Sequence, residues 1–199
     1  MNKPYSESCD QNRDPILAVL KPLFVDCKDV LEIGSGTGQH AVYFAEKMPE
    51  LTWHSSDTQE NHDAIHQWLN EAALANTRSP IDLDVSRSEW PQKRFDAVFS
   101  ANTAHIMHWP MVEDLFTGVG KVLRNDGLFV LYGPFNYNNQ FTSDSNARFD
   151  IWLKERDPYS GVRNFEDVNQ LAENAGMQLK QDYEMPANNR ILCWQKLSA

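Results

Sequence analysis

The stretch VLEIGSGTGQH, residues 30–40, decides how the rest of this chain is interpreted. Its first four residues are mostly apolar, as in a short buried strand, and three alternate glycines follow. Glycine reaches positive φ at little cost and lets a ligand approach the backbone closely. Residues 39–48 then predict a helix, whose unpaired N–H groups and positive dipole end would face the turn. A strand, a glycine turn and a helix in this order predict a cradle for a nucleotide-type ligand.

The bulk properties describe one domain of ordinary size. A chain of 199 residues fits a single domain, expected over residues 1–199, with an N-terminal extension and helix over 1–25. The formal net charge of −10 argues against an extended nucleic-acid footprint, which needs clustered Lys and Arg. No apolar run approaches the roughly 20 residues of a membrane span, and residues 1–7 lack the apolar core of a signal peptide. We therefore expect a cytoplasmic protein with no membrane segment.

The cysteines and histidines show no metal or disulfide pattern. Cys9, Cys27 and Cys193 are odd in number, far apart and outside C-x-x-C spacing, so we interpret them as free thiols. His62 and His66 lie four residues apart on a predicted helix, but no third ligand accompanies them. The sequence therefore predicts no metal site.

Strand-like and helix-like segments alternate along most of the chain. Parallel strands are predicted over residues 30–33, 51–56, 81–85, 95–99 and 128–134. Crossover helices are predicted over residues 39–48, 61–75 and 110–123. An earlier helix is expected to begin at Asp14-Pro15 after an extended start, with Asp14 as N-cap and Pro15 as first helical residue. The alternation predicts an α/β fold with a Rossmann-like, doubly wound sheet.

The last third changes character. A polar loop over residues 136–145 is followed by a helix through Trp152 and a second helix over 165–175. Two closing strands are predicted over 177–184 and 190–196. We interpret residues 136–176 as a substrate-side insertion.

Acidic residues follow two of the predicted strands, at the edge of an open α/β sheet where ligands bind. Asp57 ends the second strand, roughly 20 residues beyond the glycine turn, where an acid would accept hydrogen bonds from a ribose diol. Its alternative role is to N-cap the next helix. Asp84 and Val85 end the third strand, and Asp82 is an alternative on the same face. Asp57 favours an adenosine-containing ligand.

The segment after the fourth strand, residues 100–109, reads Ser-Ala-Asn-Thr-Ala-His-Ile-Met-His-Trp. His105 and His108 are candidates for a general base, because histidine titrates near neutral pH. A structural role beside the following helix is the alternative for both. We select His105 as the candidate catalytic residue.

The glycine motif resembles motif I of the class I S-adenosylmethionine (SAM) dependent methyltransferases, written [DE]-x-G-x-G-x-G. Glu32 stands at the acidic position. The resemblance implies a seven-stranded, mostly parallel sheet of order 3-2-1-4-5-7-6 that ends in an antiparallel hairpin. It also implies that the turn formed by Gly34, Ser35, Gly36 and Gly38 accommodates the amino-acid end of SAM, with Glu32 beneath it.

The same resemblance implies roles at the later strand ends. Asp84 would accept a hydrogen bond from the adenine amino group, with Val85 against the ring, although a solvated acidic loop is the alternative. Asn102 lies in the segment that faces the SAM methyl group. Relatives that methylate the amino groups of adenine or glutamine usually carry [ND]-P-P-[YF] there, and this chain does not. That departure disfavours those acceptors.

Polar residues are expected to line the acceptor half of the site. Asn12 and Arg13 precede the first predicted helix, and Arg156 and Arg163 lie among alternating Arg and Asp residues of the last third. Arginines near an acceptor would suit a carboxylate or a phosphate, whereas a surface ion-pair network is the alternative. Asn189, before the last predicted strand, is grouped with them.

Over nearly its whole length the chain resembles a smaller family of predicted methyltransferases, a domain of unknown function that includes methyltransferase-like protein 26. The resemblance is carried by residues 12–17, 32–38, 141–150, 156–158 and 186–189. It implies SAM as cofactor, with S-adenosylhomocysteine (SAH) as product, and it implies no known acceptor.

Three functional hypotheses follow. The first is SAM-dependent O- or N-methylation of a small molecule, an anionic acceptor being one option. The second is a non-catalytic SAM-binding partner or sensor subunit, whose cofactor pocket would look the same. The third is a nicotinamide-dependent oxidoreductase, which shares Asp57 but is disfavoured by the G-x-G-x-G spacing and the lack of a separate substrate domain.

Overall fold

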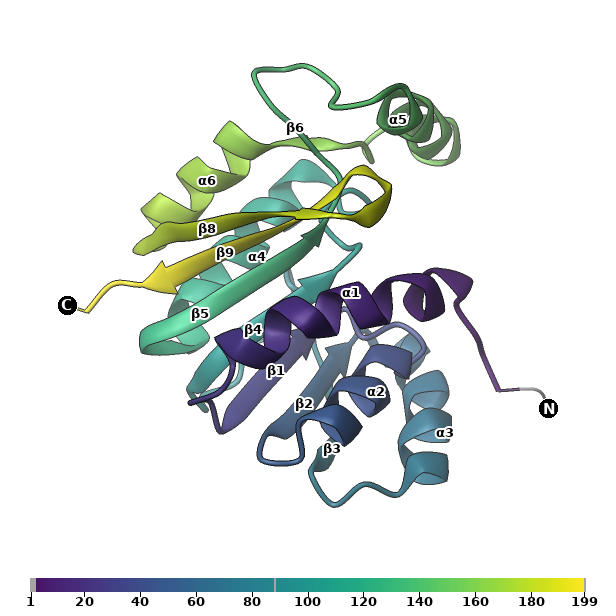
Figure 1. The fold of residues 1–199 in the computed structure, drawn as a ribbon, viewed down its shortest axis with the longest axis vertical. Helices are drawn as coiled ribbons and strands as arrows, with labels where there is room; N and C mark the ends of the chain where they lie inside the picture. Colours follow the sequence, from purple (N-terminus) through teal and green to yellow (C-terminus); the bar gives the residue numbers. More distant parts are fainter. Residues whose placement is uncertain (1–2, 88, 199) are drawn as a thin grey trace.

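The computed structural model describes residues 3–87 and 89–198, which form a sheet of seven strands between layers of helices (Figure 1). Its strands are β1 (Asp29–Ile33), β2 (Thr52–Asp57), β3 (Thr77–Asp82), β4 (Phe95–Ala101), β5 (Leu123–Gly133), β8 (Met177–Met185) and β9 (Asn189–Lys196). Two short strands, β6 (Phe135–Asn136) and β7 (Arg163–Asn164), pair only with each other among the described residues. Met1, Asn2, Ser88 and Ala199 belong to the expected domain and lie outside the described residues.

The sheet has the order β3-β2-β1-β4-β5-β9-β8. Strands β1 to β5 run parallel, β9 is antiparallel to β5, and β8 is antiparallel to β9. With the separate β6–β7 pair set aside, this is the predicted order 3-2-1-4-5-7-6, and the fold class is confirmed. The order reverses between β1 and β4, so the carboxyl ends of these two strands mark the ligand-binding edge of the sheet.

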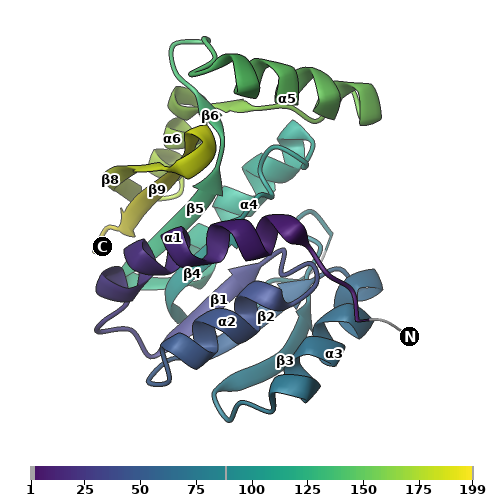
Figure 2. The ribbon, with the colours of Figure 1, turned by 45° about the vertical axis from the view of Figure 1, so that its right-hand side comes forward.

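Helices cover both faces of the sheet. One face carries α1 (Glu7–Leu23), α2 (Gln39–Lys47) and α3 (His62–Ala72), and the other carries α4 (Trp109–Val122) and α6 (Phe165–Asn174) (Figure 1). The helix α5 (Asp144–Arg156) lies on neither face but beyond the carboxyl ends of the strands (Figure 2). Two single turns of 3₁₀ helix, η1 (Gln59–Asn61) and η2 (Pro186–Asn188), complete the described elements. None of these helices is long and apolar enough to cross a bilayer.

The core is divided in two by the sheet. Val30 packs toward α1 and α2, whereas its neighbour Leu31 packs toward α4, and both side chains are fully buried. Successive residues of a strand point to opposite faces, so a strand buried on both sides must be apolar without interruption. This requirement explains why the apolar runs predicted the central strands well.

The first helix begins earlier than its sequence suggested. Ser6 is the N-cap of α1, and its hydroxyl accepts a hydrogen bond from the backbone N–H of Cys9 at 3.4 Å. The prediction that α1 starts at Asp14-Pro15 is therefore wrong, and Pro15 lies inside the helix. A proline there removes one intrahelical hydrogen bond, which the packing of Ile16 and Leu20 in the core offsets.

The third strand lies earlier than predicted. β3 spans Thr77–Asp82 rather than residues 81–85, and it is one of the two edge strands of the seven-stranded sheet. Edge strands tolerate polar residues and proline, here Pro80, because one side of the ladder needs no hydrogen bonds. Asp84 and Val85 consequently lie in the loop that follows β3.

Candidate functional site

The glycine turn after β1 is fixed to the neighbouring strand. Gly34, Gly36 and Gly38 have φ values of +72°, +57° and +89°, a region that L side chains adopt only with strain. The backbone N–H groups of Gly34 and Ser35 both donate to the carbonyl oxygen of Ser56 at 3.0 Å. The turn is therefore an extension of the β1–β2 pair.

The three glycines serve two purposes. A Cβ added to Gly34 would lie 2.5 Å from the Cγ2 of Thr103, and one added to Gly38 would lie 3.0 Å from the Cα of Ile65. At Gly36 an added Cβ would meet no heavy atom of the described residues within 4 Å. Gly34 and Gly38 are thus required by packing, whereas Gly36 faces open space at the carboxyl end of β1.

Asp57 lies directly beside this open position. Its Oδ2 accepts a hydrogen bond from the backbone N–H of Gly36 at 2.7 Å. Its Oδ1 accepts from the backbone N–H of Thr58 and the side-chain amide of Asn61, both at 2.8 Å. The structure therefore brings together two of the predicted cofactor residues and fixes the orientation of the carboxylate.

Glu32 is buried beneath the turn. Its Oε2 accepts hydrogen bonds from the Ser35 hydroxyl at 2.9 Å and the Trp53 indole N–H at 3.0 Å. Burial raises the pKa of this carboxyl to about 7, and the nearby charge of Asp57 adds to the effect, although the two donors oppose it. Glu32 supports the turn from below.

The start of α1 closes over the start of α2 next to the glycine turn. The side chain of Gln39 hydrogen-bonds to both the backbone N–H and the carbonyl of Ser6. Asn12 is buried, and its Oδ1 forms a 2.7 Å hydrogen bond with Nε2 of His40. Burial lowers the pKa of His40 to about 4, so this histidine is neutral at physiological pH. Sequence reasoning missed Gln39 and His40, because neither carries a motif for helix docking.

His105 lies in the middle of the segment that joins β4 to α4. Its side chain is buried, and the ring meets the edge of Phe149 with centroids 5.2 Å apart. Burial, and secondarily the charge of Arg163, lower the pKa of His105 to about 4. Within the described residues no hydrogen bond reaches either ring nitrogen. Asn102 stands three residues before it with φ +59° and donates its backbone N–H to the carbonyl of Tyr132 at 2.9 Å.

The arginines predicted for the acceptor side have separate partners in the structure. Arg13 pairs with Asp10 at 2.7 Å, and its guanidinium lies 4.8 Å from the centroid of the Tyr43 ring of α2. Arg163 donates hydrogen bonds to the backbone carbonyls of Ala104, Met107 and Tyr159.

Of the other two predicted acceptor-side residues, Arg156 is the last residue of α5 and Asn189 is the first residue of β9. Arg156 lies over the ring of Trp152, 4.6 Å from its centroid. Asn189 donates to the carbonyls of Pro186 and Ala187 at the start of β9.

A cavity of about 480 Å³ lies between the loop after β3 and the start of α4. Its lining residues are Asp84, Ser86, Arg87, His108, Trp109, Pro110, Met111 and Tyr159. Oδ1 of Asp84 accepts the backbone N–H of Ser86 at 3.0 Å, and the neighbouring Val85 is buried. Aromatic rings on one wall and a carboxylate on the other suit a ligand with a flat ring that carries polar groups at its edge.

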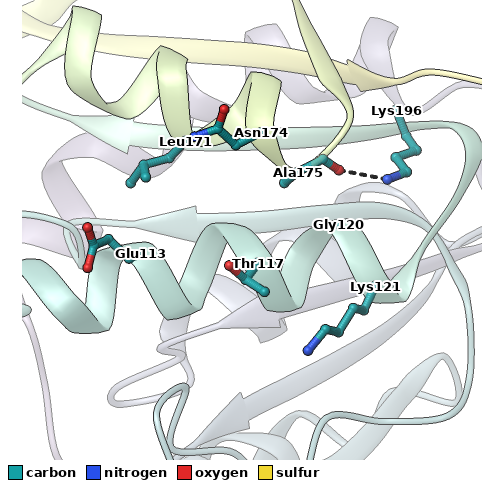
Figure 3. A pocket seen from close by; sticks show the side chains of 8 residues that line it. All are labelled: Glu113, Thr117, Gly120, Lys121, Leu171, Asn174, Ala175 and Lys196. Atoms are coloured by element: carbon teal, nitrogen blue, oxygen red, sulfur yellow. Dashed lines mark hydrogen bonds between the residues drawn. The ribbon is translucent and has the colours of Figure 1, made fainter.

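A second hollow of about 340 Å³ lies between α4 and α6, lined by Glu113, Thr117 and Lys121 on one side and Leu171 and Asn174 on the other (Figure 3). Lys196 closes one end by donating to the carbonyl of Ala175 at 2.7 Å. This hollow contains none of the predicted site residues. Among the described residues, no three His, Cys, Asp or Glu side chains gather as a metal site.

Comparisons with known proteins agree with this architecture. The model of a family described as protein of unknown function (DUF938) matches residues 3–196. A fatty-acid O-methyltransferase of Mycolicibacterium smegmatis is 31% identical over 159 residues, which cover 78% of this chain and 52% of that protein.

Solved structures show the same fold at low sequence identity. The S-adenosylmethionine-dependent methyltransferase SibL, in its apo form, superposes with a TM-score of 0.81 at 18% identity, over 96% of this chain and 56% of that one. PigF with SAH superposes with a TM-score of 0.78 at 13% identity, over 92% of this chain and 61% of that one. The chain thus spans roughly half the length of the relatives that it matches. These structures confirm the Rossmann-like fold of class I methyltransferases.

Proposed function

The chain belongs to the DUF938 family, proteins of unknown function, and we propose that it is a SAM-dependent methyltransferase acting on an oxygen or nitrogen of a small molecule. The observation that carries this proposal is the open position at Gly36, whose N–H is bound by Asp57 at the switch point of the sheet. The name of the M. smegmatis relative and the SAH in PigF support it.

The residues present fit SAM. An adenosine ligand needs a backbone cradle without side chains and an acid beside it, and Gly36 and Asp57 provide both. We propose that the turn from Gly34 to Gly38 holds the amino-acid end and that Asp57 binds the ribose. Asp84, which lines the cavity after β3, and the buried Val85 beside it would receive the adenine ring, with Asn102 toward the reacting end. Bound there, SAM supplies an electrophilic methyl group on a sulfonium.

The protein's contribution is then mainly one of positioning. A methyl transfer needs the nucleophile, the methyl carbon and the sulfur in line, and holding reactants in that geometry provides much of the rate. The rigid glycine turn would fix the position of SAM, and so of the methyl carbon and the sulfur in this alignment. His105, neutral at physiological pH, lies at the end of β5, where its ring is 3.5 Å from the position of a Cβ on Gly133. We propose that it contacts the acceptor.

An oxygen acceptor is favoured over nitrogen. The M. smegmatis relative is named for O-methylation of a fatty acid, whose nucleophile is a carboxylate oxygen. The chain also lacks the [ND]-P-P-[YF] segment of the amino-group methyltransferases.

Calorimetric titration with SAM, SAH and NAD tests the cofactor. We expect micromolar binding of SAM and SAH and none of NAD. Binding of NAD alone would replace the proposal by hydride transfer. SAM binding without methyl transfer to any member of a panel of carboxylic acids, alcohols and amines would indicate a SAM-binding partner or sensor subunit.

A further inference from the structure

The helix α5 buries two polar side chains and leaves two large apolar ones exposed. Asn146 and Asp150 are buried together with Leu153, whereas Ile151 and Trp152 are 58% and 47% exposed. A surface helix ordinarily buries its apolar stripe and exposes its polar residues. Large exposed apolar side chains that occur together commonly mark a binding surface.

Hydrogen bonds fix this orientation. The side-chain amide of Asn146 donates to the Thr142 hydroxyl and the carbonyl of Asn188, both at 3.0 Å. Oδ1 of Asp150 accepts the backbone N–H of Val162 at 2.8 Å. Because both anchors are buried and satisfied, α5 cannot rotate its aromatic residues into the core without losing them.

The half-buried Phe149 and the exposed Trp152 form a row that starts at the candidate catalytic histidine. The ring of Phe149 contacts His105, and Trp152 stacks on Phe149 with centroids 5.7 Å apart and an angle of 17° between the planes. The guanidinium of Arg156 lies 4.6 Å from the centroid of the Trp152 ring. We call Phe149, Trp152 and Arg156 the aromatic row. It places two stacked rings and one cation beside the reacting edge of the sheet.

His105 lacks the partner that an activated general base has. A base that deprotonates a hydroxyl is usually oriented and made more basic by a carboxylate on its other nitrogen. No Asp or Glu of the described residues hydrogen-bonds to His105, and its charged neighbour is the guanidinium of Arg163. An acceptor oxygen that is already ionised at neutral pH needs no such base.

Building on the proposed function, we propose that the aromatic row is the acceptor subsite and that it takes a flat aromatic carboxylate. The ring lies along Phe149 and Trp152, and the carboxylate points to His105. An oxygen lone pair forms the bond to the methyl carbon while the carbon–sulfur bond breaks and its electron pair goes to sulfur. The products are a methyl ester and SAH, and no proton is removed. Stacking and cation–π attraction favour an aryl over an alkyl body.

The test is calorimetric titration of the SAH-saturated protein with 2-naphthoate, decanoate and 2-naphthol. We expect 2-naphthoate to bind most tightly, and Trp152→Ala to weaken its binding about tenfold, the scale of one aromatic stacking contact. Ile151→Ala is the matched control, because Ile151 is also exposed on α5 but lies outside the aromatic row. Both variants should bind SAH as the native protein does.

The outcomes separate this inference from the proposed function. Absence of SAH binding in the native protein refutes the proposed function itself. SAH binding together with equal 2-naphthoate affinities of the two variants, or with no 2-naphthoate binding, refutes the aromatic row alone. Binding of decanoate that is tighter than that of 2-naphthoate overturns the preference for an aromatic acceptor. Binding of 2-naphthol that equals that of 2-naphthoate overturns the requirement for a carboxylate.

Discussion

The backbone N–H of Gly36 donates a 2.7 Å hydrogen bond to Oδ2 of Asp57, which joins the glycine turn to the end of the next strand. The two residues are 21 positions apart in sequence but form one structural unit. Because the other carboxylate oxygen is held by Thr58 and Asn61, the acid cannot turn away from the open position at Gly36. The two residues can therefore be tested as a pair.

Replacing Gly36 should abolish SAM binding and leave the fold intact. In Gly36→Leu the side chain enters the open space, and the left-handed backbone costs about 1–2 kcal/mol of stability. Gly176→Leu is the matched control, because Gly176 has φ +75° and lies before β8, at the opposite edge of the sheet. Calorimetry and thermal unfolding should show similar stabilities but SAM binding only in the control. SAM affinity retained in Gly36→Leu would refute the cradle.

Replacing Asp57 should weaken SAM binding in proportion to the hydrogen bonds lost. Asp57→Ala removes a charged acceptor, which is worth about 1–3 kcal/mol and corresponds to roughly 5–150-fold in the Kd for SAM. Asp63→Ala removes one negative charge from the exposed first turn of α3 and should leave the Kd unchanged. If the two variants bind SAM equally well, Asp57 has no role in holding the ribose.

The buried Glu32 should make the protein less stable as pH rises. Its pKa is about 7 in the folded protein and near 4.5 when exposed, so the folded state binds the proton more tightly. The stabilising effect is complete below pH 4.5 and is lost as pH rises to about 7, a difference on the order of 3 kcal/mol. Glu32→Gln keeps an acceptor for Trp53 and Ser35 and should lose this dependence.

Urea unfolding of the native protein and the Glu32→Gln variant between pH 4.5 and 8 measures this difference. His40 and His105 act in the opposite direction, because their lowered pKa values make stability fall as pH drops from 6.5 toward 4. The difference between native and variant cancels their contribution. Glu50→Gln, at an exposed position, should follow the native curve. Parallel curves for the native protein and Glu32→Gln would contradict the prediction.

His105→Ala should slow methyl transfer without changing the Kd for SAM, because the histidine is expected to contact the acceptor. His108→Ala tests the other candidate, which is 45% exposed and paired with Asp157 at 2.7 Å. The rate of the native enzyme should not change with His105 protonation above pH 5, since the pKa of His105 is lowered to about 4. The assay is methyl transfer to 2-naphthoate or to another acid found active in the panel. Equal rates in native protein and His105→Ala would make this residue structural.

The sequence predicted the elements that are determined by burial. Val30 and Leu31 face opposite halves of the core, so β1 had to be an unbroken apolar run. The edge strand β3 need not be apolar throughout. Its polar residues Thr77 and Arg78 pair with β2, so no apolar run in the sequence predicts the start of this strand. The start of α1 was misplaced because the Asp14-Pro15 pair is a stronger helix-start pattern than Ser6.

The candidate site divides in the same way. The positions of Gly36 and Asp57 follow from local spacing and strand order, both of which can be deduced from sequence. The partners of Arg163 cannot be deduced from sequence, because they are three backbone carbonyls that belong to two different loops. The aromatic row was equally hidden. Apolar periodicity assigns Trp152 to a core, and only the buried hydrogen bonds of Asn146 and Asp150 show that it faces outward.

The docking of α1 has a consequence for the order of events during synthesis. Asn12, which precedes the sheet in the sequence, forms a 2.7 Å hydrogen bond with His40 and lies beside the hydroxyl of Tyr132, whose pKa burial raises although the Asn12 contact lowers it. Tyr132 belongs to β5, so α1 cannot reach its final position until β5 has been translated. Although α1 precedes β5 in the chain, its docking on the sheet is therefore completed only after β5 has been made.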